Sequence, residues 1–219
     1  MTAAKPAPVT TEPVPTPAGD ARITLHPAPA PKAVLALGHG AGGGIEARDL
    51  AALAAALPAR GVSVALVEQP WRVAGKKVAP APRTLDAGWL PVAERLTGAG
   101  LPLVVGGRSA GARVACRTGA ASGAVGVLAL AFPLHPPGRP EKSRADELLS
   151  SGLPTLVVQG PADPFGGPAE FPELPASHEL LALPAGNHGF EVPKRAGLGQ
   201  QELLDLVVSA VGDWVLRLV

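Results

Sequence analysis

Three residues of the types that form a catalytic triad occur along the chain in the order serine, acid, histidine. Ser109 lies in the motif Gly-Arg-Ser-Ala-Gly at 107–111, and Asp163 and His188 follow it. A serine hydroxyl is a poor nucleophile near neutral pH, so it needs a basic histidine, which a carboxylate in turn orients. We therefore expect Ser109 to be a nucleophile, His188 its general base and Asp163 the orienting acid.

Taken singly, each of these residues also has a non-catalytic explanation. The motif around Ser109 could be a glycine-rich turn that only links a strand to a helix. Asp163 precedes Pro164 and could form an ordinary turn, and His188 could be a loop histidine. All three follow separate predicted strands in the order that the chemistry requires. We favour the triad because this joint occurrence is stronger evidence than any one residue.

A second glycine-rich segment, Gly-His-Gly-Ala-Gly-Gly-Gly at 38–44, follows the first predicted strand. Glycine-rich loops can turn backbone N–H groups toward a developing oxyanion. We expect the amide of Ala41, with Gly42 as second choice, to act together with the amide of Ala110. A phosphate-binding loop is the alternative, but the Lys-Ser or Lys-Thr sequel and the GxGxxG spacing are absent. His39 is expected to steady the loop by hydrogen bonds.

The elements that must position these residues are short apolar runs that alternate with helical patterns. Runs that are apolar throughout belong in a sheet buried on both faces, and helices supply the crossovers between parallel strands. The predicted fold is therefore α/β, a doubly wound and mostly parallel sheet flanked by helices, whose sites lie at the carboxyl ends of strands. Strands are expected at 33–37, 62–67, 103–105, 125–131, 155–159 and 179–183, and helices at 47–57, 84–96, 110–118 and 200–218.

The proline distribution suggests how the chain is divided. Of the 26 prolines, eight fall within the first 31 residues. Residues 1–20 are expected to form an extended, disordered segment, and 21–219 a single domain. About twenty residues separate Pro133 from Pro154, enough for a loop and one helix near 144–150 but not for a lid domain. We expect the site to be open.

Composition limits the remaining function classes. The net charge of +1 gives no global attraction to nucleic acid or membranes, and aromatic residues make up only 3%. The chain has no apolar run long enough to span a bilayer. A single cysteine, Cys116, and an N-terminal segment rich in proline predict a cytoplasmic protein. The five histidines show no metal-binding spacing, so neither a metal nor another cofactor is expected.

Four motifs stand out in the sequence: GHGAGG at 38–43, GRSAGAR at 107–113, FPLHPPG at 132–138 and NH at 187–188. They resemble motifs of α/β-hydrolases, and more narrowly of the group that contains testis-expressed protein 30 and the non-specific-lethal complex subunit 3, related to dienelactone hydrolases. The resemblance covers residues 20–219 and implies the α/β-hydrolase fold. Dienelactone hydrolases carry cysteine at the nucleophile position, where this chain has Ser109, which favours ester-type acyl transfer.

The predicted activity is that of a serine hydrolase acting on small carboxylic esters or thioesters through an acyl-enzyme. The alternative is a non-catalytic interaction module that keeps the hydrolase frame. Gly42, Arg108 and His135 are candidate substrate-binding residues, although His135 could equally be structural and Arg108 could form a salt bridge elsewhere. The basic segment 72–83 could attract an anionic substrate group, but a solvated loop is the simpler reading.

Overall fold

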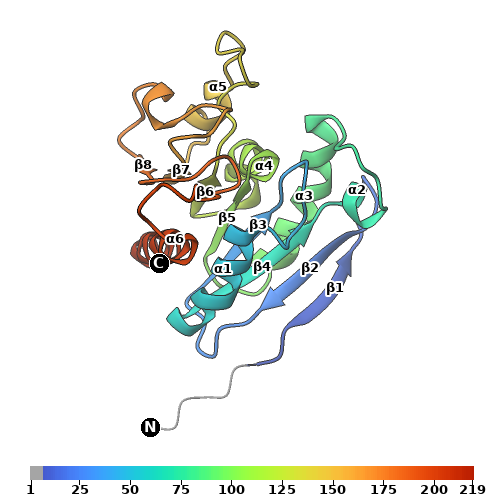
Figure 1. The fold of residues 1–219 in the computed structure, drawn as a ribbon. Helices are drawn as coiled ribbons and strands as arrows, with labels where there is room; N and C mark the ends of the chain where they lie inside the picture. The colour runs from blue at the N-terminus through green and yellow to red at the C-terminus, as the bar shows by residue number, and fades with distance from the viewer. Residues whose placement is uncertain (1–6) are drawn as a thin grey trace, which may run out of the picture.

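The computed structural model describes residues 7–219, and its strands form a single eight-stranded sheet (Figure 1). The strands are β1 (Thr10–Val14), β2 (Ala21–His26), β3 (Ala33–Gly38), β4 (Val62–Glu68), β5 (Leu103–Arg108), β6 (Gly126–Leu130), β7 (Thr155–Gln159) and β8 (His178–Ala182). Their order across the sheet is β1-β2-β4-β3-β5-β6-β7-β8. Neighbours from β4 to β8 pair in parallel, whereas β1 pairs with β2, and β2 with β4, antiparallel.

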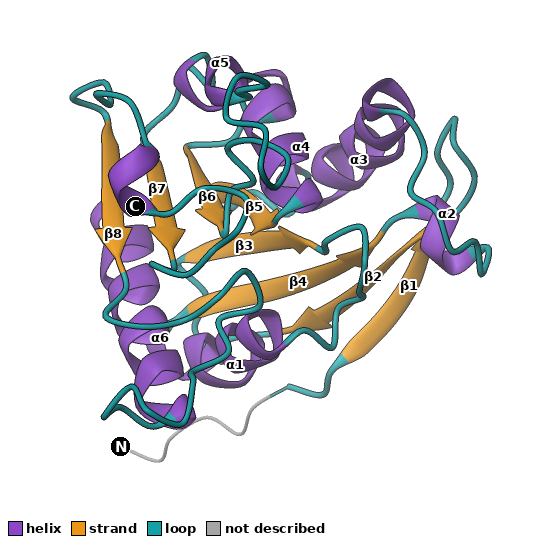
Figure 2. Cartoon of the chain, turned by 45° about the horizontal axis from the view of Figure 1, so that its top comes forward, coloured by secondary structure: helices purple, strands orange, loops and turns teal. Residues whose placement is uncertain are grey.

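Helices cover both faces of this sheet. They are α1 (Arg48–Ala56), α2 (Pro70–Val73), α3 (Pro82–Thr97), α4 (Ala110–Thr118), α5 (Ala145–Leu149) and α6 (Gln200–Arg217). Helices α1 and α6 pack together on one face, and α3 and α4 on the other (Figures 1 and 2). None of the helices in the described part of the chain is both long enough and apolar enough to cross a bilayer.

The central strands are buried on both sides because each contributes alternate side chains to two cores. In β3, Val34 and Ala36 join the core under α3 and α4, where Trp89 lies. The intervening Leu35 and Leu37 join the core under α1 and α6. A strand that faces two apolar layers has no polar face. The predicted doubly wound, mostly parallel α/β fold is confirmed.

The N-terminal segment differs from the expectation of disorder over residues 1–20. Residues 10–14 form β1, whose Val14 is buried and pairs with Ala21 of β2. The proline content led to a wrong prediction here because β1 is an edge strand. On the outer side of an edge strand, Pro13 needs no hydrogen-bonded neighbour in the sheet. Ordered structure therefore begins before residue 20. Residues 1–6, to which the expectation also applied, lie outside the described part.

Candidate active site

Ser109, His188 and Asp163 meet at the carboxyl edge of the sheet. The His188 Nε2 atom lies 2.9 Å from the Ser109 Oγ, and the His188 Nδ1 atom lies 2.8 Å from the Asp163 Oδ2. An ionised carboxylate only accepts hydrogen bonds, so Nδ1 carries the proton and Nε2 is free to accept one from the serine hydroxyl. The structure thus brings together the three residues predicted from the sequence, in one hydrogen-bonded chain.

Ser109 occupies a sharp turn between β5 and α4. Its φ of 53° and ψ of −112° lie in a region that non-glycine residues rarely adopt. Its backbone N–H donates to the Leu130 carbonyl at 2.9 Å, which fixes the turn to the end of β6. A Cβ atom on Gly107 or Gly111 would lie 2.4 or 2.5 Å from the Gly38 carbonyl oxygen. The two glycines of the motif are therefore needed because the loop after β3 passes directly against the turn.

The Asp163 carboxylate is buried and held by three donors. In addition to His188, the backbone N–H of Phe165 donates to Oδ1 at 2.8 Å, and Gln159 Nε2 donates to Oδ2 at 2.9 Å. The Phe165 ring also packs on the imidazole of His188, with 4.4 Å between ring centroids. Sequence reasoning missed Gln159 and Phe165. The sequence signal for Gln159 was an amide at the end of a strand whose centre is apolar.

The predicted oxyanion donors Ala41 and Ala110 line the same small recess. The N–H of Ala110 belongs to the first turn of α4, whose amides have no intrahelical acceptor. The N–H of Ala41 has no acceptor within the described part of the chain. A Cβ atom on Gly42 would have no other atom within 4 Å, and Gly42 does not line the recess. The geometry favours the first choice, Ala41, over Gly42.

His39 connects the glycine-rich loop after β3 to Gln69, the residue directly after β4. Its Nδ1 donates to the Gly40 carbonyl at 2.9 Å, and its Nε2 accepts from the Gln69 backbone N–H at 3.2 Å. Burial lowers the pKa of His39, which keeps the ring neutral as this pair of bonds requires. These contacts match the loop-steadying role expected for His39.

Arg108 does not extend freely into a substrate pocket. Its Nε atom donates to the Asp49 Oδ2 at 3.1 Å, and its Nη2 atom donates to the backbone carbonyl of His188. Asp49 is fully buried. Of the two roles considered from the sequence, the contacts favour the salt bridge, and they tie Arg108 to the loop that carries His188.

His135 is also occupied by protein contacts. Its Nδ1 lies 2.9 Å from the Pro136 carbonyl oxygen and its Nε2 lies 3.0 Å from the Glu170 Oε2. Both ring nitrogens are thereby used, which favours the structural alternative over substrate binding.

The basic segment 72–83 also has contacts within the protein. The Arg72 Nη2 atom lies 3.8 Å from the Glu46 Oε1 atom, and Lys76 lines a cavity beside α2.

A second serine–histidine pair, Ser151 and His178, lies at the opposite edge of the sheet, where β8 begins. The His178 Nε2 atom is 3.2 Å from the Ser151 Oγ but only 3.0 Å from the Leu148 carbonyl oxygen. Because a carbonyl can only accept, Nε2 must carry the proton and cannot take one from Ser151. This pair is structural.

Two further groups bear on the chemistry. Cys116 is buried against the sheet, and burial raises the pKa of its thiol to about 12, so it stays protonated near neutral pH. Among residues 7–219, no cluster of three or more His, Cys, Asp or Glu side chains could hold a metal ion.

Comparisons with known proteins agree with this geometry at the level of fold. A family model described as an alpha/beta hydrolase domain matches residues 31–216. A lidless α/β serine hydrolase from Xanthomonas campestris superimposes with a TM-score of 0.74 at 21% identity, covering 99% of this chain and 97% of that chain. A dienelactone hydrolase from Anabaena variabilis gives a TM-score of 0.71 at 17% identity, covering 96% and 97%. The chain matches no curated protein sequence.

Proposed function

Because the chain belongs to the α/β-hydrolase domain family, we propose that it is a serine hydrolase that cleaves small carboxylic esters or thioesters through an acyl-enzyme. The observation that carries this proposal is the hydrogen-bonded chain from Ser109 through His188 to Asp163. A scaffold protein has no physical need for a buried carboxylate, an oriented imidazole and a strained serine in one line. The alternative of a non-catalytic module is therefore less well supported.

The mechanism follows from the positions of these groups. His188 Nε2 takes the Ser109 proton as Oγ attacks the substrate carbonyl carbon. The N–H groups of Ala41 and Ala110 donate to the oxyanion, and the N-terminus of α4 adds a favourable dipole. His188 then protonates the leaving alcohol or thiol. A water molecule, deprotonated by His188, attacks the acyl-enzyme and releases the acid, while Asp163 fixes the imidazole tautomer throughout.

Narrower assignments rest on sequence features alone. Membership of the group with testis-expressed protein 30 and the non-specific-lethal complex subunit 3 is part of this proposal, carried by the four motifs. A cytoplasmic location is likewise proposed, on the single cysteine. The substrate is a small molecule, and the proposal includes no metal, cofactor or nucleic acid.

The test is the hydrolysis of p-nitrophenyl acetate and butyrate, together with labelling by a fluorophosphonate probe. Replacing Ser109 by Ala should lower kcat by about 10⁴-fold or more and abolish labelling, because the nucleophile is gone. Asp163→Asn should cost somewhat less. Ser151→Ala is the matched control, since the other buried serine–histidine pair should leave kcat unchanged. Equal rates or equal labelling for wild type and Ser109→Ala would refute the proposal.

A further inference from the structure

A small recess adjoins the proposed oxyanion site. Its volume is about 10 Å³, room for about one water molecule or methyl group. Its lining includes Ala41 and Ala110, the residues of the two proposed oxyanion amides, together with the apolar residues Leu85 and Val114. A substrate whose carbonyl oxygen faces the two amides would therefore place a neighbouring apolar group in this recess.

The acyl group, not the leaving group, fits this recess. The leaving-group oxygen must face His188, because Nε2 protonates it. Among the described residues, the loop that carries His188 contributes nothing to the recess lining. It contributes Gly189 instead to a separate cavity of about 410 Å³, which is also lined by Glu46 and Arg48. The polar cavity thus suits the leaving group, and the apolar recess suits the acyl chain.

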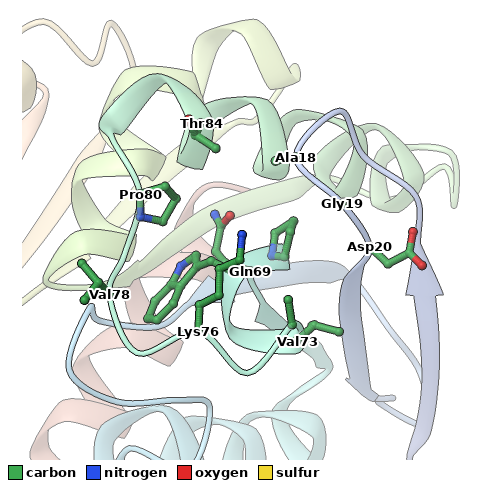
Figure 3. A pocket seen from close by; sticks show the side chains of 12 residues that line it. Ala18, Gly19, Asp20, Gln69, Val73, Lys76, Val78, Pro80 and Thr84 are labelled. Carbon is green, nitrogen blue, oxygen red and sulfur yellow. The ribbon is translucent and has the colours of Figure 1, made fainter.

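A larger cavity of about 310 Å³ lies beyond the recess, beside α2 (Figure 3). In the close-up, Gln69 lies near the centre, and Ala18, Val73, Val78 and Pro80 are among the residues arranged around it. Gln69 and Trp71 line both this outer cavity and the recess. These two side chains are therefore the shared wall between the space next to the oxyanion site and the larger space outside it.

The two residues of this wall are held differently. Gln69 is fixed by hydrogen bonds, since its Nε2 donates to the Leu85 carbonyl at 3.2 Å and its backbone N–H donates to His39. The Trp71 side chain is buried, but its Nε1 has no hydrogen-bond partner among the described residues. Its ring packs on His39 with 5.6 Å between centroids. Trp71 is thus the bulky part of the wall, and packing alone holds its side chain.

We propose that Trp71 is the specificity-determining end wall of the acyl site and restricts the substrate to acyl groups of two or three carbons. This inference rests on the proposed hydrolase function. In wild type, a longer chain would meet the indole ring after the first methylene or two. Without the indole, the recess would open into the outer cavity, where Val73, Val78 and Pro80 offer an apolar surface for a medium-length chain.

The experiment compares kcat/KM for p-nitrophenyl acetate and p-nitrophenyl octanoate. We expect wild type to prefer acetate by about tenfold or more, and Trp71→Ala to raise the octanoate-to-acetate ratio by about tenfold, since several methylenes gain an apolar site. Trp71→Phe should give a smaller rise in the same direction. Because the ratio is taken within one enzyme sample, it does not depend on the fraction that folds.

A second substitution provides the matched control. In the Trp71→Ala background, Ala18→Trp refills the outer cavity from its far side and should return the ratio toward the wild-type value while acetate hydrolysis persists. An unchanged ratio in both Trp71→Ala and Trp71→Phe, or equal wild-type efficiency on the two esters, would overturn this inference alone, provided that acetate hydrolysis depends on Ser109. Activity that survives Ser109→Ala would overturn the proposed function with it.

Discussion

Arg108, the residue before the proposed nucleophile Ser109, contacts two parts of the site that are far apart in sequence. It pairs with Asp49 of α1 and donates to the backbone carbonyl of His188. Asp49 is buried, and its second oxygen, Oδ1, has no partner in the part of the chain that the structure describes. A buried carboxylate with one unpaired oxygen is stabilised by its one cationic partner, which is here Arg108. We infer that Arg108 is a positioning residue that holds the His188 loop in place.

This role predicts a loss of turnover without a loss of substrate binding. Arg108→Ala should lower kcat by about 10- to 100-fold, since small displacements of a catalytic base are costly, while KM stays within about threefold. Added guanidinium ion should restore part of kcat, because it can refill the site between Asp49 and the His188 carbonyl. Arg217→Ala removes an exposed arginine that pairs with Glu179 at the start of β8, and it should leave kcat of the folded enzyme unchanged. Equal kcat for wild type and Arg108→Ala would contradict the role.

The residues of the proposed site differ in how far the sequence reveals them. Ser109, Asp163 and His188 are recognisable because their types, order and neighbouring glycines meet a chemical requirement. Gln159 and Phe165 carry no such mark, since each acts only through what the fold places beside it. For the same reason, Arg108 could not be assigned between a pocket and a salt bridge until its distance to Asp49 was known.

Helix α4, which begins directly after Ser109, is anchored to its neighbours by an ionic network. Arg113 makes two hydrogen bonds to Glu147 of α5, at 2.8 and 2.5 Å. Arg117 reaches both Glu147 and Asp86 of α3. The side chains of this network are about one-fifth exposed, so solvent screens the attraction between their charges less than in a fully exposed ion pair. It fixes the helix whose N-terminus faces the proposed oxyanion.

The network predicts a pH-dependent contribution to stability. Burial alone would raise the pKa of Glu147, but hydrogen bonds and charge from Arg113 and Arg117 outweigh it and lower the pKa below its ordinary value of 4.5. The stabilisation is therefore present above pH 4.5 and is lost as the pH falls through the lower pKa of the folded state. Glu147→Gln should reduce the free energy of unfolding by about 1 to 2 kcal/mol at pH 7.

Urea unfolding of wild type and Glu147→Gln at pH 7, 5 and 3 checks this prediction. The difference in the free energy of unfolding between wild type and Glu147→Gln should persist at pH 5 and shrink at pH 3. Glu141→Gln, at an exposed position, should give no difference at any of these values. A difference in the free energy of unfolding that is constant with pH would show that the charge of the Glu147 carboxylate contributes nothing to stability.

At the level of elements, the central strands were predictable, and the N-terminal ones were not. Strand β7 was expected over the residues that form it, because its centre, Leu156 to Val158, is apolar and the strand is bounded by prolines and a glycine. Strands β1 and β2 belong to the antiparallel edge, where one face is half exposed and the apolar signal is weak. The four-residue helix α2 is too short to show a helical period.

At the level of the whole molecule, the fold explains why so few residues suffice for a site. The carboxyl ends of β5, β7 and β8 lie along one edge of a parallel array, so Ser109, Asp163 and His188 need only short loops to meet. The connection from β6 to β7 contains the five-residue α5 and no other helix of the described chain, so no lid domain covers that edge. Access to Ser109 is therefore governed by nearby side chains.

The antiparallel edge lies away from the triad, which predicts that stability and catalysis separate on truncation. Strand β1 covers the outer side of β2, buries Val14 and brings Glu12 within 3.2 Å of Arg95 in α3. Removing residues 1–8 leaves β1 intact and should change Tm by less than about 2 °C. Removing residues 1–19 exposes β2 and should lower Tm by about 5 °C or more, since a loss near 2 kcal/mol shifts a chain of this size by that much.

Thermal unfolding and p-nitrophenyl acetate hydrolysis at 25 °C distinguish the outcomes. Both truncated proteins should keep kcat/KM for acetate within about threefold of wild type, because β2, β4 and β3 separate β1 from β5 in the sheet, and β7 and β8 lie farther still. Equal Tm values for the two truncations would mean that β1 pairs without stabilising the domain. A large loss of acetate activity in the shorter protein, below its Tm, would instead show that the antiparallel edge holds the parallel strands in register, and the separation of stability from catalysis would be wrong.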